Sequence, residues 1–371
     1  MHPEQLAVSG VSKLTPYQPG KPIAELEREL GISNIIKLAS NENPLGPGPK
    51  ALEAIQAESG SLHLYPDGGG FDLKAALAGK LGIDPAQITL GNGSNDVLEL
   101  AARAFLSAET SAVFSQHAFA VYPIVTQAVG AHAHVAKAHD GTRGPLYGHD
   151  LDAMHQLIEE DTRLIFIANP NNPTGTYLGR DELAGFLKKV PAHALTVVDE
   201  AYFEYVSEPD YPNTLEWLEC YPNLIVTRTF SKAYGLAGLR VGYAVSSLCI
   251  ADLLNRVRQP FNVNSLALVA AKAALSDDGH LQRTVLLNHE GLGLLTEALA
   301  KRGLSHIPSV GNFITADVGR VALPVYEALL REGVIVRPIA NYGLPNHLRV
   351  TVGTKKENQV FLSALDRVLA L

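Results

Sequence analysis

Short apolar, β-branched runs alternate with segments of helical periodicity through most of the chain. The helical segments are 97–106, 151–158 and 181–190, where apolar residues recur every three or four positions. A strand, a crossover helix and a further strand in succession form a mostly parallel sheet with helices on both faces. The strands predicted on this basis are 88–90, 112–115, 131–136, 164–168, 195–199, 224–229 and 241–245.

The pattern changes after about residue 265, and this change predicts a second, smaller α+β domain. The elements predicted there are helices at 280–302, 324–331 and 355–369, and strands at 313–316, 334–337 and 348–352. The N-terminal residues, with an amphipathic segment at 23–30, are too few to fold alone and should pack on one of the two domains. We therefore expect an α/β protein with a large domain at 40–265 and a small domain formed by 1–39 and 266–371.

Composition and charge narrow the kinds of partner. The formal net charge is −8, so no broad basic surface for nucleic acid or anionic lipid is expected. No apolar stretch approaches the roughly 18 residues of a membrane span, and the N-terminal residues show no secretory signal, so we expect a cytoplasmic protein. Cys220 and Cys249 lie beside apolar residues without disulfide or metal spacing, which favours buried, inert thiols.

A glycine-rich turn, Gly91-Asn92-Gly93-Ser94-Asn95-Asp96, joins the first predicted strand to the next helix. A helix N-terminus has free N–H groups and a positive dipole end, which suit a phosphate, and Ser94 or Asn95 would cap it. The turn lacks the third glycine of the dinucleotide fingerprint and the acidic residue about 20 positions later. It is equally compatible with a capped connection that binds no ligand.

The loop from Asn169 to Gly175 also follows a predicted strand. Its prolines and asparagines fix an irregular backbone. The loop is either a plain turn or a rigid support that aims an asparagine amide at a ligand oxygen.

The most informative chemistry lies at the ends of two strands. Phe230-Ser231-Lys232 follows one strand and Asp199 ends another. An amine there can bond covalently to the aldehyde of pyridoxal phosphate, and an aspartate can keep the pyridine nitrogen protonated. Tyr202 could donate to the phenolate oxygen of the ring. The phosphate ligands predicted with them are Thr229, Ser231 and Arg240.

Lys232 and Asp199 also have a simpler interpretation, in which each is a solvated surface group. Small, apolar and glycine residues flank Lys232, which suits a partly buried loop and a lowered lysine pKa. The run before Asp199 is largely apolar, and a buried carboxylate requires a cationic partner. A pyridinium nitrogen would be such a partner.

Other chemistries find less support in the sequence. His132, His134 and His139 have no cysteine at ligand spacing, so we predict no metal site. The chain contains neither a Gly-x-Ser-x-Gly elbow nor a His-Glu-x-x-His motif, which disfavours hydrolases.

Together these residues resemble the fold-type I pyridoxal-phosphate-dependent aminotransferases. In order and spacing, the family's asparagine, aspartate, tyrosine, lysine and phosphate-binding arginine correspond to Asn172, Asp199, Tyr202, Lys232 and Arg240. Arg349 corresponds to the arginine that binds the substrate's acidic group. The resemblance spans nearly the whole chain and implies an aspartate-aminotransferase-like fold.

Within the family, the chain is most similar to the group that acts on histidinol phosphate. The similarity lies in residues 14–20, 38–46, 65–68 and 116–122. It implies that Phe119 stacks on the cofactor ring and that Tyr65 reaches across a homodimer to the neighbour's phosphate. The residues that it places around the substrate are Tyr17, Asn43, Arg337 and Arg349.

Two arginines on predicted strands, Arg337 and Arg349, also favour a phosphorylated substrate. A phosphomonoester carries nearly two negative charges and several acceptors, which suit two guanidinium groups. The simpler interpretation is that Arg337 is a surface residue of an edge strand.

The expected reaction converts L-histidinol phosphate and 2-oxoglutarate into imidazole acetol phosphate and L-glutamate, a step of histidine biosynthesis. Lys232 would take the Cα proton and deliver it to the C4′ carbon of the cofactor, acting as base and then as acid. An aromatic amino-acid aminotransferase and a decarboxylase of a phosphorylated amino acid stay open. A non-enzymatic cofactor-binding regulator lacks support, because no basic helix-turn-helix pattern precedes residue 40. A nicotinamide-dependent oxidoreductase rests only on the incomplete glycine pattern.

Overall fold

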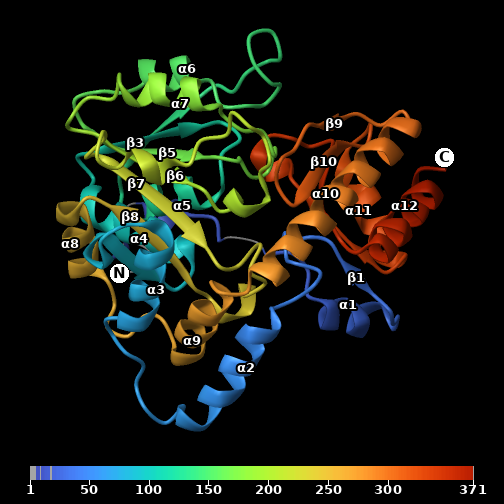
Figure 1. The fold of residues 1–371 in the computed structure, drawn as a ribbon. Coiled ribbons are helices and arrows are strands. Elements are labelled where there is room, and N and C mark those ends of the chain that lie inside the picture. Colours follow the sequence, from blue (N-terminus) through green and yellow to red (C-terminus); the bar gives the residue numbers. More distant parts are fainter. Residues whose placement is uncertain (1–5, 9, 17–18, 371) are drawn as a thin grey trace.

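Two main sheets, each with its own hydrophobic core, organise the chain (Figure 1). A computed structural model describes residues 6–8, 10–16 and 19–370. The long helix α10 (Asp278–Lys301) runs from beside the large sheet toward the small one.

The large sheet has seven strands in the order β2-β8-β7-β6-β5-β3-β4. Strand β8 runs antiparallel to both of its neighbours, and the other pairs are parallel. The carboxyl ends of β5, β6 and β7 therefore lie at one edge of the sheet. The strands are β2 (Ile88–Gly91), β3 (Ser111–Ser115), β4 (His132–Ala136), β5 (Thr162–Ala168), β6 (Leu195–Asp199), β7 (Leu224–Thr229) and β8 (Gly242–Ser246).

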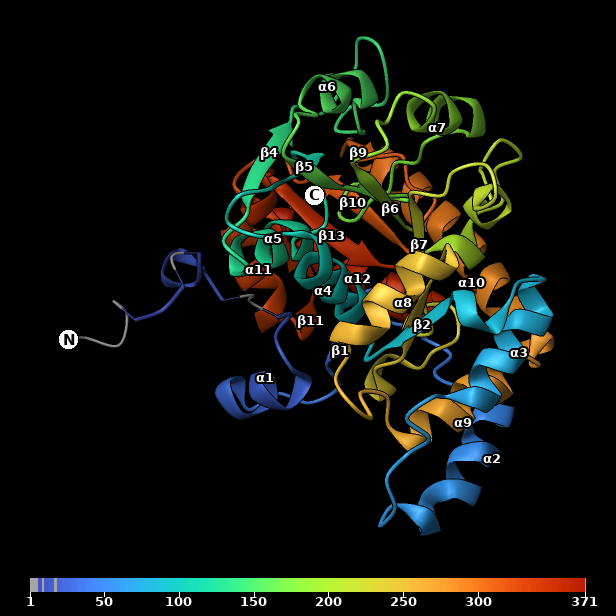
Figure 2. The same ribbon diagram turned by 90° about the vertical axis from the view of Figure 1, so that its left-hand side faces the viewer.

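Helices cover both faces of this sheet because the central strands are apolar on both sides (Figures 1 and 2). In β5, Ile165 and Ile167 point into one core, while Leu164 and Phe166 point into the other. One face carries α4 (Ser94–Phe105), α5 (Val121–Ala128) and α8 (Leu248–Val257). The other carries α3 (Phe71–Leu81), α6 (Leu151–Gln156), α7 (Arg180–Leu187) and α9 (Ser265–Ala274), with α2 (Pro49–Glu58) packed on α9.

The small sheet is antiparallel, in the order β12-β13-β10-β9, and packs against α10, α11 and α12. Its elements are β9 (His306–Ile307), β10 (Phe313–Asp317), α11 (Ala322–Arg331), β12 (Arg337–Pro338), β13 (His347–Thr351) and α12 (Lys355–Leu369). The N-terminal segment joins this side, because β1 (Ile36–Lys37) pairs with β11 (Val334–Ile335). Leu26 of α1 (Ile23–Leu30) packs on Ile335. The 3-10 helices are η2 (Val11–Lys13), η3 (Ser59–Ser61), η4 (Pro85–Gln87), η5 (Phe203–Tyr205), η6 (Thr214–Trp217), η7 (Ala237–Leu239) and η8 (Ala340–Tyr342).

The predicted fold class is confirmed: a mixed, mainly parallel sheet lies between helices, beside a smaller α+β unit. The prediction of one strand at 334–337 is wrong. Val334 and Ile335 pair with β1, whereas Arg337 pairs with β13, so the run is divided between two sheets. The helices not predicted individually from the sequence are α2, α3, α5, α8 and α9.

The predicted domain limits, 40–265 and 1–39 with 266–371, stay a prediction. Helix α9 falls almost wholly within the predicted small domain, yet its alanines lie in the core of the large sheet. The prediction of buried cysteines is wrong, since Cys220 and Cys249 are exposed free thiols.

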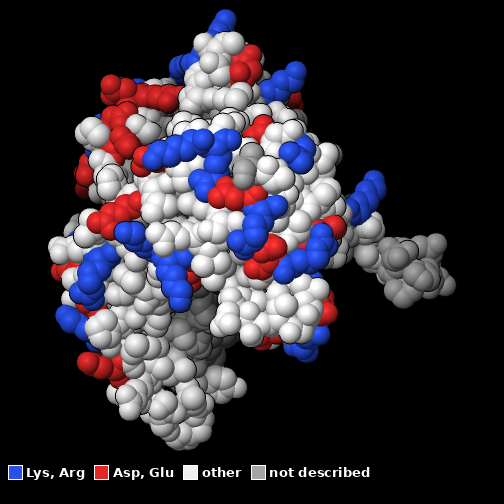
Figure 3. Space-filling view, turned by 90° about the vertical axis from the view of Figure 1, so that its right-hand side faces the viewer, with Lys and Arg blue, Asp and Glu red and all other residues white. Residues whose placement is uncertain are grey.

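The surface shown in Figure 3 carries Lys and Arg interspersed with Asp and Glu. Among the described residues, none of the helices combines the length and the apolar character needed to cross a membrane.

Candidate active site

One cavity lies where the carboxyl ends of β5, β6 and β7 meet the small sheet and the segment after β1. This is the edge at which ligands bind in parallel α/β sheets. The structure brings most of the predicted site residues together here. The predicted residues that line the cavity are Ser94, Asn95, Phe119, Asn172, Asp199, Tyr202, Thr229, Ser231, Lys232, Arg240, Arg337 and Arg349.

Asp199 is held at the end of β6 by two hydroxyl groups. Tyr122 donates to its Oδ2 at 3.0 Å, and Thr227 of the adjacent strand donates to its Oδ1 at 2.9 Å. Burial raises the pKa of Asp199 to about 6, against the lowering effect of these hydrogen bonds. Both donors fix the carboxylate in place, yet neither supplies positive charge. A buried carboxylate in this setting is suited to a cationic ligand.

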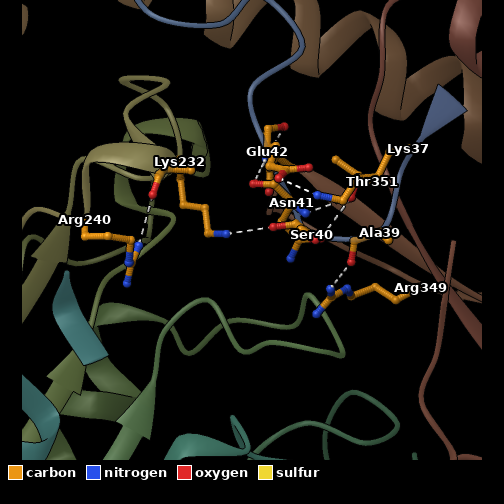
Figure 4. A network of polar contacts seen from close by, with 11 residues as sticks. Lys37, Ala39, Ser40, Asn41, Glu42, Lys232, Arg240, Arg349 and Thr351 are labelled. Carbon is orange, nitrogen blue, oxygen red and sulfur yellow. Dashed lines mark hydrogen bonds and ion pairs between the residues drawn. The ribbon is translucent and has the colours of Figure 1, made fainter. Parts of the chain in front are cut away.

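Lys232 lies in the loop after β7 and points across the cavity, where its Nζ donates to the Ser40 carbonyl at 3.0 Å (Figure 4). Burial, followed by the positive charge of Arg349, lowers the pKa of Lys232 to about 7. A large fraction of this amine is therefore neutral at physiological pH, which makes it a nucleophile and a proton acceptor.

The N-terminus of α4 and Arg240 form an anion seat at one end of the cavity. Arg240 donates to Ser231 Oγ at 3.3 Å, and its guanidinium lies directly over the turn before α4. A Cβ atom on Gly93 would lie 2.3 Å from Arg240 Nη2, so only glycine allows this approach. Ser94, Asn95 and Thr229 complete the seat, which combines helix-end N–H groups, hydroxyls and a guanidinium.

Three side chains surround the middle of the cavity. Phe119 stands edge-on against the buried ring of Tyr122, with ring centres 5.9 Å apart. Tyr202 is buried, and burial raises its pKa to about 12, so its hydroxyl keeps its proton. Asn172 follows Asn171, whose Nδ2 donates to the His117 carbonyl at 2.9 Å and so anchors the loop.

The small sheet contributes two arginines from directly opposite positions, Arg337 on β12 and Arg349 on β13. Arg349 is 7% exposed and donates to Asn172 Oδ1 at 2.5 Å and to the Ala39 carbonyl at 2.7 Å. Its buried Nε has no hydrogen-bond partner in the part of the chain that the structure describes. Among the described residues, no carboxylate forms an ion pair with Arg349. Both guanidinium groups line the cavity, so together they are suited to an anionic ligand.

Two predicted residues, Asn43 and Tyr65, do not line the cavity, and a third cannot be placed. Tyr17 lies outside the described residues. Asn43 is buried elsewhere, where its Nδ2 donates to the Ala233 carbonyl and to Thr284 Oγ1, each at 3.0 Å. Tyr65 is 83% exposed and stacks on Phe261, with ring centres 4.8 Å apart.

The residues that position the functional side chains could not be identified from the sequence. Tyr122 and Thr227 hold Asp199, while the Ser40 carbonyl accepts from Lys232 and Asn41 donates to Tyr202. Tyr122 and Asn41 lie within the stretches that carried the family resemblance, but no local pattern showed which residues they contact.

One group in the described part of the chain has side chains at metal-ligand spacing: His134, Glu159 and Asp161, with ligand atoms within 4.8 Å of one another. None of the three lines the cavity. The prediction of no metal site stays a prediction.

Residues 33–365 match the family described as aminotransferase class I and II, and the chain belongs to this family. It is 65% identical over 364 residues to histidinol-phosphate aminotransferase 2 of Methylococcus capsulatus, covering 98% of each chain. It is 60% identical over 367 residues to histidinol-phosphate aminotransferase 2 of Pseudomonas aeruginosa, again covering 98% of each. The chain is thus an aminotransferase, as predicted.

The solved structures agree on the fold. Histidinol-phosphate aminotransferase from Sinorhizobium meliloti, in complex with pyridoxal-5'-phosphate, has a TM-score of 0.88 at 29% identity, over 98% of this chain and 97% of that one. An aspartate aminotransferase double mutant of Thermus thermophilus has a TM-score of 0.82 at 21% identity, over 97% and 99% of the two chains. The predicted aspartate-aminotransferase-like fold is confirmed.

Proposed function

We propose that this chain transfers the amino group of L-histidinol phosphate to 2-oxoglutarate, giving imidazole acetol phosphate and L-glutamate, with pyridoxal phosphate as cofactor. The relatives at 60–65% identity bear the corresponding name. The observation that carries the proposal is the placement of Arg337 and Arg349, which line the same cavity as Lys232 and Asp199. The substrate phosphate would neutralise the two opposed guanidinium groups.

The residues present fit pyridoxal phosphate at three points. The seat at Gly93 and Arg240 suits its phosphate, Asp199 suits a protonated ring nitrogen, and Lys232 suits its aldehyde. When bound, the cofactor supplies an aldehyde that takes up the amino group and a ring that stabilises negative charge on the substrate carbon. The residues proposed to hold it are Ser94, Asn95, Phe119, Asn172, Asp199, Tyr202, Thr229, Ser231, Lys232 and Arg240.

The chain itself performs the proton transfers. Lys232, with a pKa of about 7, would take a proton from the substrate Cα as base and then, as acid, give it to the former aldehyde carbon of the cofactor. Asp199 keeps a proton on the ring nitrogen, because its own carboxylate is buried and held by Tyr122 and Thr227. Arg349 binds the substrate phosphate in one half-reaction and a carboxylate of 2-oxoglutarate in the other.

A homodimer with Tyr65 reaching the neighbouring site is part of the proposal. Tyr65 and Leu64 lie on an apolar groove between α2, α3 and α9, away from the cavity of their own chain. Tyr65 is 83% exposed, which is unusual for a large aromatic residue in a soluble monomer. A second copy would cover this surface.

We also propose a cytoplasmic location. Its support is that Cys220 and Cys249 are exposed and unpaired, a state typical of a reducing compartment.

A panel of amino donors, each assayed with 2-oxoglutarate and the purified holoenzyme, tests the substrate assignment. We expect kcat/KM for histidinol phosphate to exceed that for phenylalanine, and Arg337→Gln to reduce this preference. The control is Arg180→Gln, since Arg180 forms an exposed ion pair with Glu216 outside the cavity. Equal values for the two donors would favour an aromatic aminotransferase, and release of carbon dioxide from a phosphorylated amino acid would indicate a decarboxylase.

A further inference from the structure

Three consecutive residues after β1 each contact a functional side chain of the cavity, and Figure 4 shows the contacts of the first two, Ala39 and Ser40. The Ala39 carbonyl accepts from Arg349 at 2.7 Å, the Ser40 carbonyl accepts from Lys232 at 3.0 Å, and Asn41 Nδ2 donates to the Tyr202 hydroxyl at 2.8 Å. The first two contacts use backbone atoms. Only Asn41 acts through its side chain, so only this contact depends on residue type.

The environment of Asn41 sets which end of its amide faces Tyr202. The Asn41 backbone N–H donates to Thr351 Oγ1 at 2.9 Å, and the Thr351 hydroxyl donates in turn to Asn41 Oδ1 at 3.2 Å. The Asn41 carbonyl accepts from Asn312 at 3.0 Å. Because Oδ1 is occupied by the Thr351 proton, Nδ2 faces Tyr202 and can only donate.

This orientation determines the direction of the Tyr202 proton. The hydroxyl oxygen accepts from Asn41, and an amide NH2 group cannot accept the tyrosine's proton. Among the residues that the structure describes, none accepts a hydrogen bond from the Tyr202 hydroxyl. Asn41 and Tyr202 both line the cavity, so the proton is available to a ligand within it.

We propose that Asn41 is a positioning residue that directs the Tyr202 hydroxyl proton at the ring oxygen of the bound cofactor. The inference rests on the proposed function, because it requires pyridoxal phosphate in this cavity. A donor to the ring oxygen stabilises its ionised form and lowers the pH at which the visible absorbance of the bound cofactor changes.

The decisive variant is Asn41→Asp, which keeps the side-chain shape and reverses the hydrogen bond. A carboxylate only accepts, so it draws the Tyr202 proton away from the cavity. Asn41 has a φ of 54°, and Asn41→Gly removes the side chain without strain at this backbone angle. The glycine variant leaves the Tyr202 proton free to rotate, so its effect should be smaller than that of aspartate.

The experiment measures the absorbance titration of each holoenzyme together with kcat/KM. Tyr202→Phe is the reference for complete loss of the donor. We expect Asn41→Asp to raise the titration midpoint by about one pH unit and to lower kcat/KM about tenfold, close to Tyr202→Phe. Asn41→Gly should lie between wild type and Asn41→Asp. Thr351→Ser should resemble wild type, and Thr351→Val should shift partway toward Asn41→Asp.

Asn34 supplies matched controls, because it is an exposed asparagine with a φ of 61° outside the cavity. Asn34→Asp and Asn34→Gly should titrate as wild type. A purely structural role for Asn41 would make Asn41→Gly at least as damaging as Asn41→Asp, and that order would overturn the inference. An unshifted midpoint in Asn41→Asp would do the same while leaving the proposed function intact. A wild-type protein that binds no pyridoxal phosphate would overturn both.

Discussion

The two walls of the cavity are built in different ways. The wall from the large sheet carries Asp199 at the end of β6, Lys232 just after β7 and Arg240 just before β8. The opposite wall carries Arg337, Arg349 and Asn41, and Asn41 and Thr351 meet although 310 positions separate them. Parallel strands bring their carboxyl ends together by topology alone, whereas the second wall requires the N-terminal segment to dock on the small sheet.

The difference separates chemistry from recognition. The first wall has groups with shifted proton affinities: burial lowers the pKa of Lys232 to about 7 and raises that of Asp199 to about 6. The second wall has guanidinium groups and hydrogen-bond donors, which bind anions and orient neighbouring groups. Substitutions of Lys232 and Asp199 in the first wall should therefore lower kcat, and substitutions of the two arginines in the second should mainly raise KM.

Replacing Lys232 should have the largest effect. Lys232→Ala removes both the covalent attachment point and the proton acceptor, so kcat should fall by about 10⁴-fold or more in the transamination assay. Lys74 is the matched control, because burial also lowers its pKa although it lies outside the cavity. Activity of Lys232→Ala near that of Lys74→Ala would remove Lys232 from the mechanism.

Asp199→Asn should have the next largest effect. The amide cannot stabilise a positive charge on the ring nitrogen, so we expect kcat to fall by about 10³-fold with a modest change in KM. Steady-state kinetics at saturating cofactor measure both. A change confined to KM would contradict the division between the walls.

The arginines of the second wall should show the opposite pattern. Arg349→Lys and Arg337→Lys retain a charge but lose the paired donors, so KM for histidinol phosphate should rise by about tenfold to a hundredfold. The kcat value at saturating substrate should change less than in Asp199→Asn. Losses in kcat as large as those for Asp199→Asn would assign the arginines to the chemical step.

The smallest expected effect is the change with pH in the rate at which the cofactor-free protein captures pyridoxal phosphate. Lys232 has a folded pKa of about 7, below the ordinary value of 10.5, so its neutral form is reached early as the pH rises. The rate at which it captures pyridoxal phosphate should increase only about twofold between pH 7 and pH 9, whereas an ordinary lysine would gain about a hundredfold. Stopped-flow absorbance measures the rate, and a continuous increase through pH 9 would contradict the lowered pKa.

The sequence predicted the first wall more completely than the second. Asp199, Lys232 and Arg240 stand in short apolar runs whose ends could be located from local pattern. The family resemblance places Asn43 around the substrate, but its amide binds Ala233 and Thr284, and Asn41 lines the cavity. Nothing local distinguishes the two asparagines, because their roles depend on Thr351 and Tyr202, which are distant in the chain.

Dependence on residues that are distant in the chain also explains the other features that the sequence did not predict. The run at 334–337 appeared as one strand, since its division depends on whether each residue pairs with β1 or β13. The Tyr122–Asp199 hydrogen bond joins α5 to β6, and residue patterns do not reveal such a contact. The family resemblance identified several site residues, and the structure shows which residues hold them in place.

The most direct test of the account maps the covalent attachment of pyridoxal phosphate. The protein is incubated with the cofactor, reduced with borohydride, digested and analysed by mass spectrometry. We expect the added mass on the peptide that contains Lys232. An unmodified Lys232, with the label absent or found on another lysine such as Lys74, would contradict it.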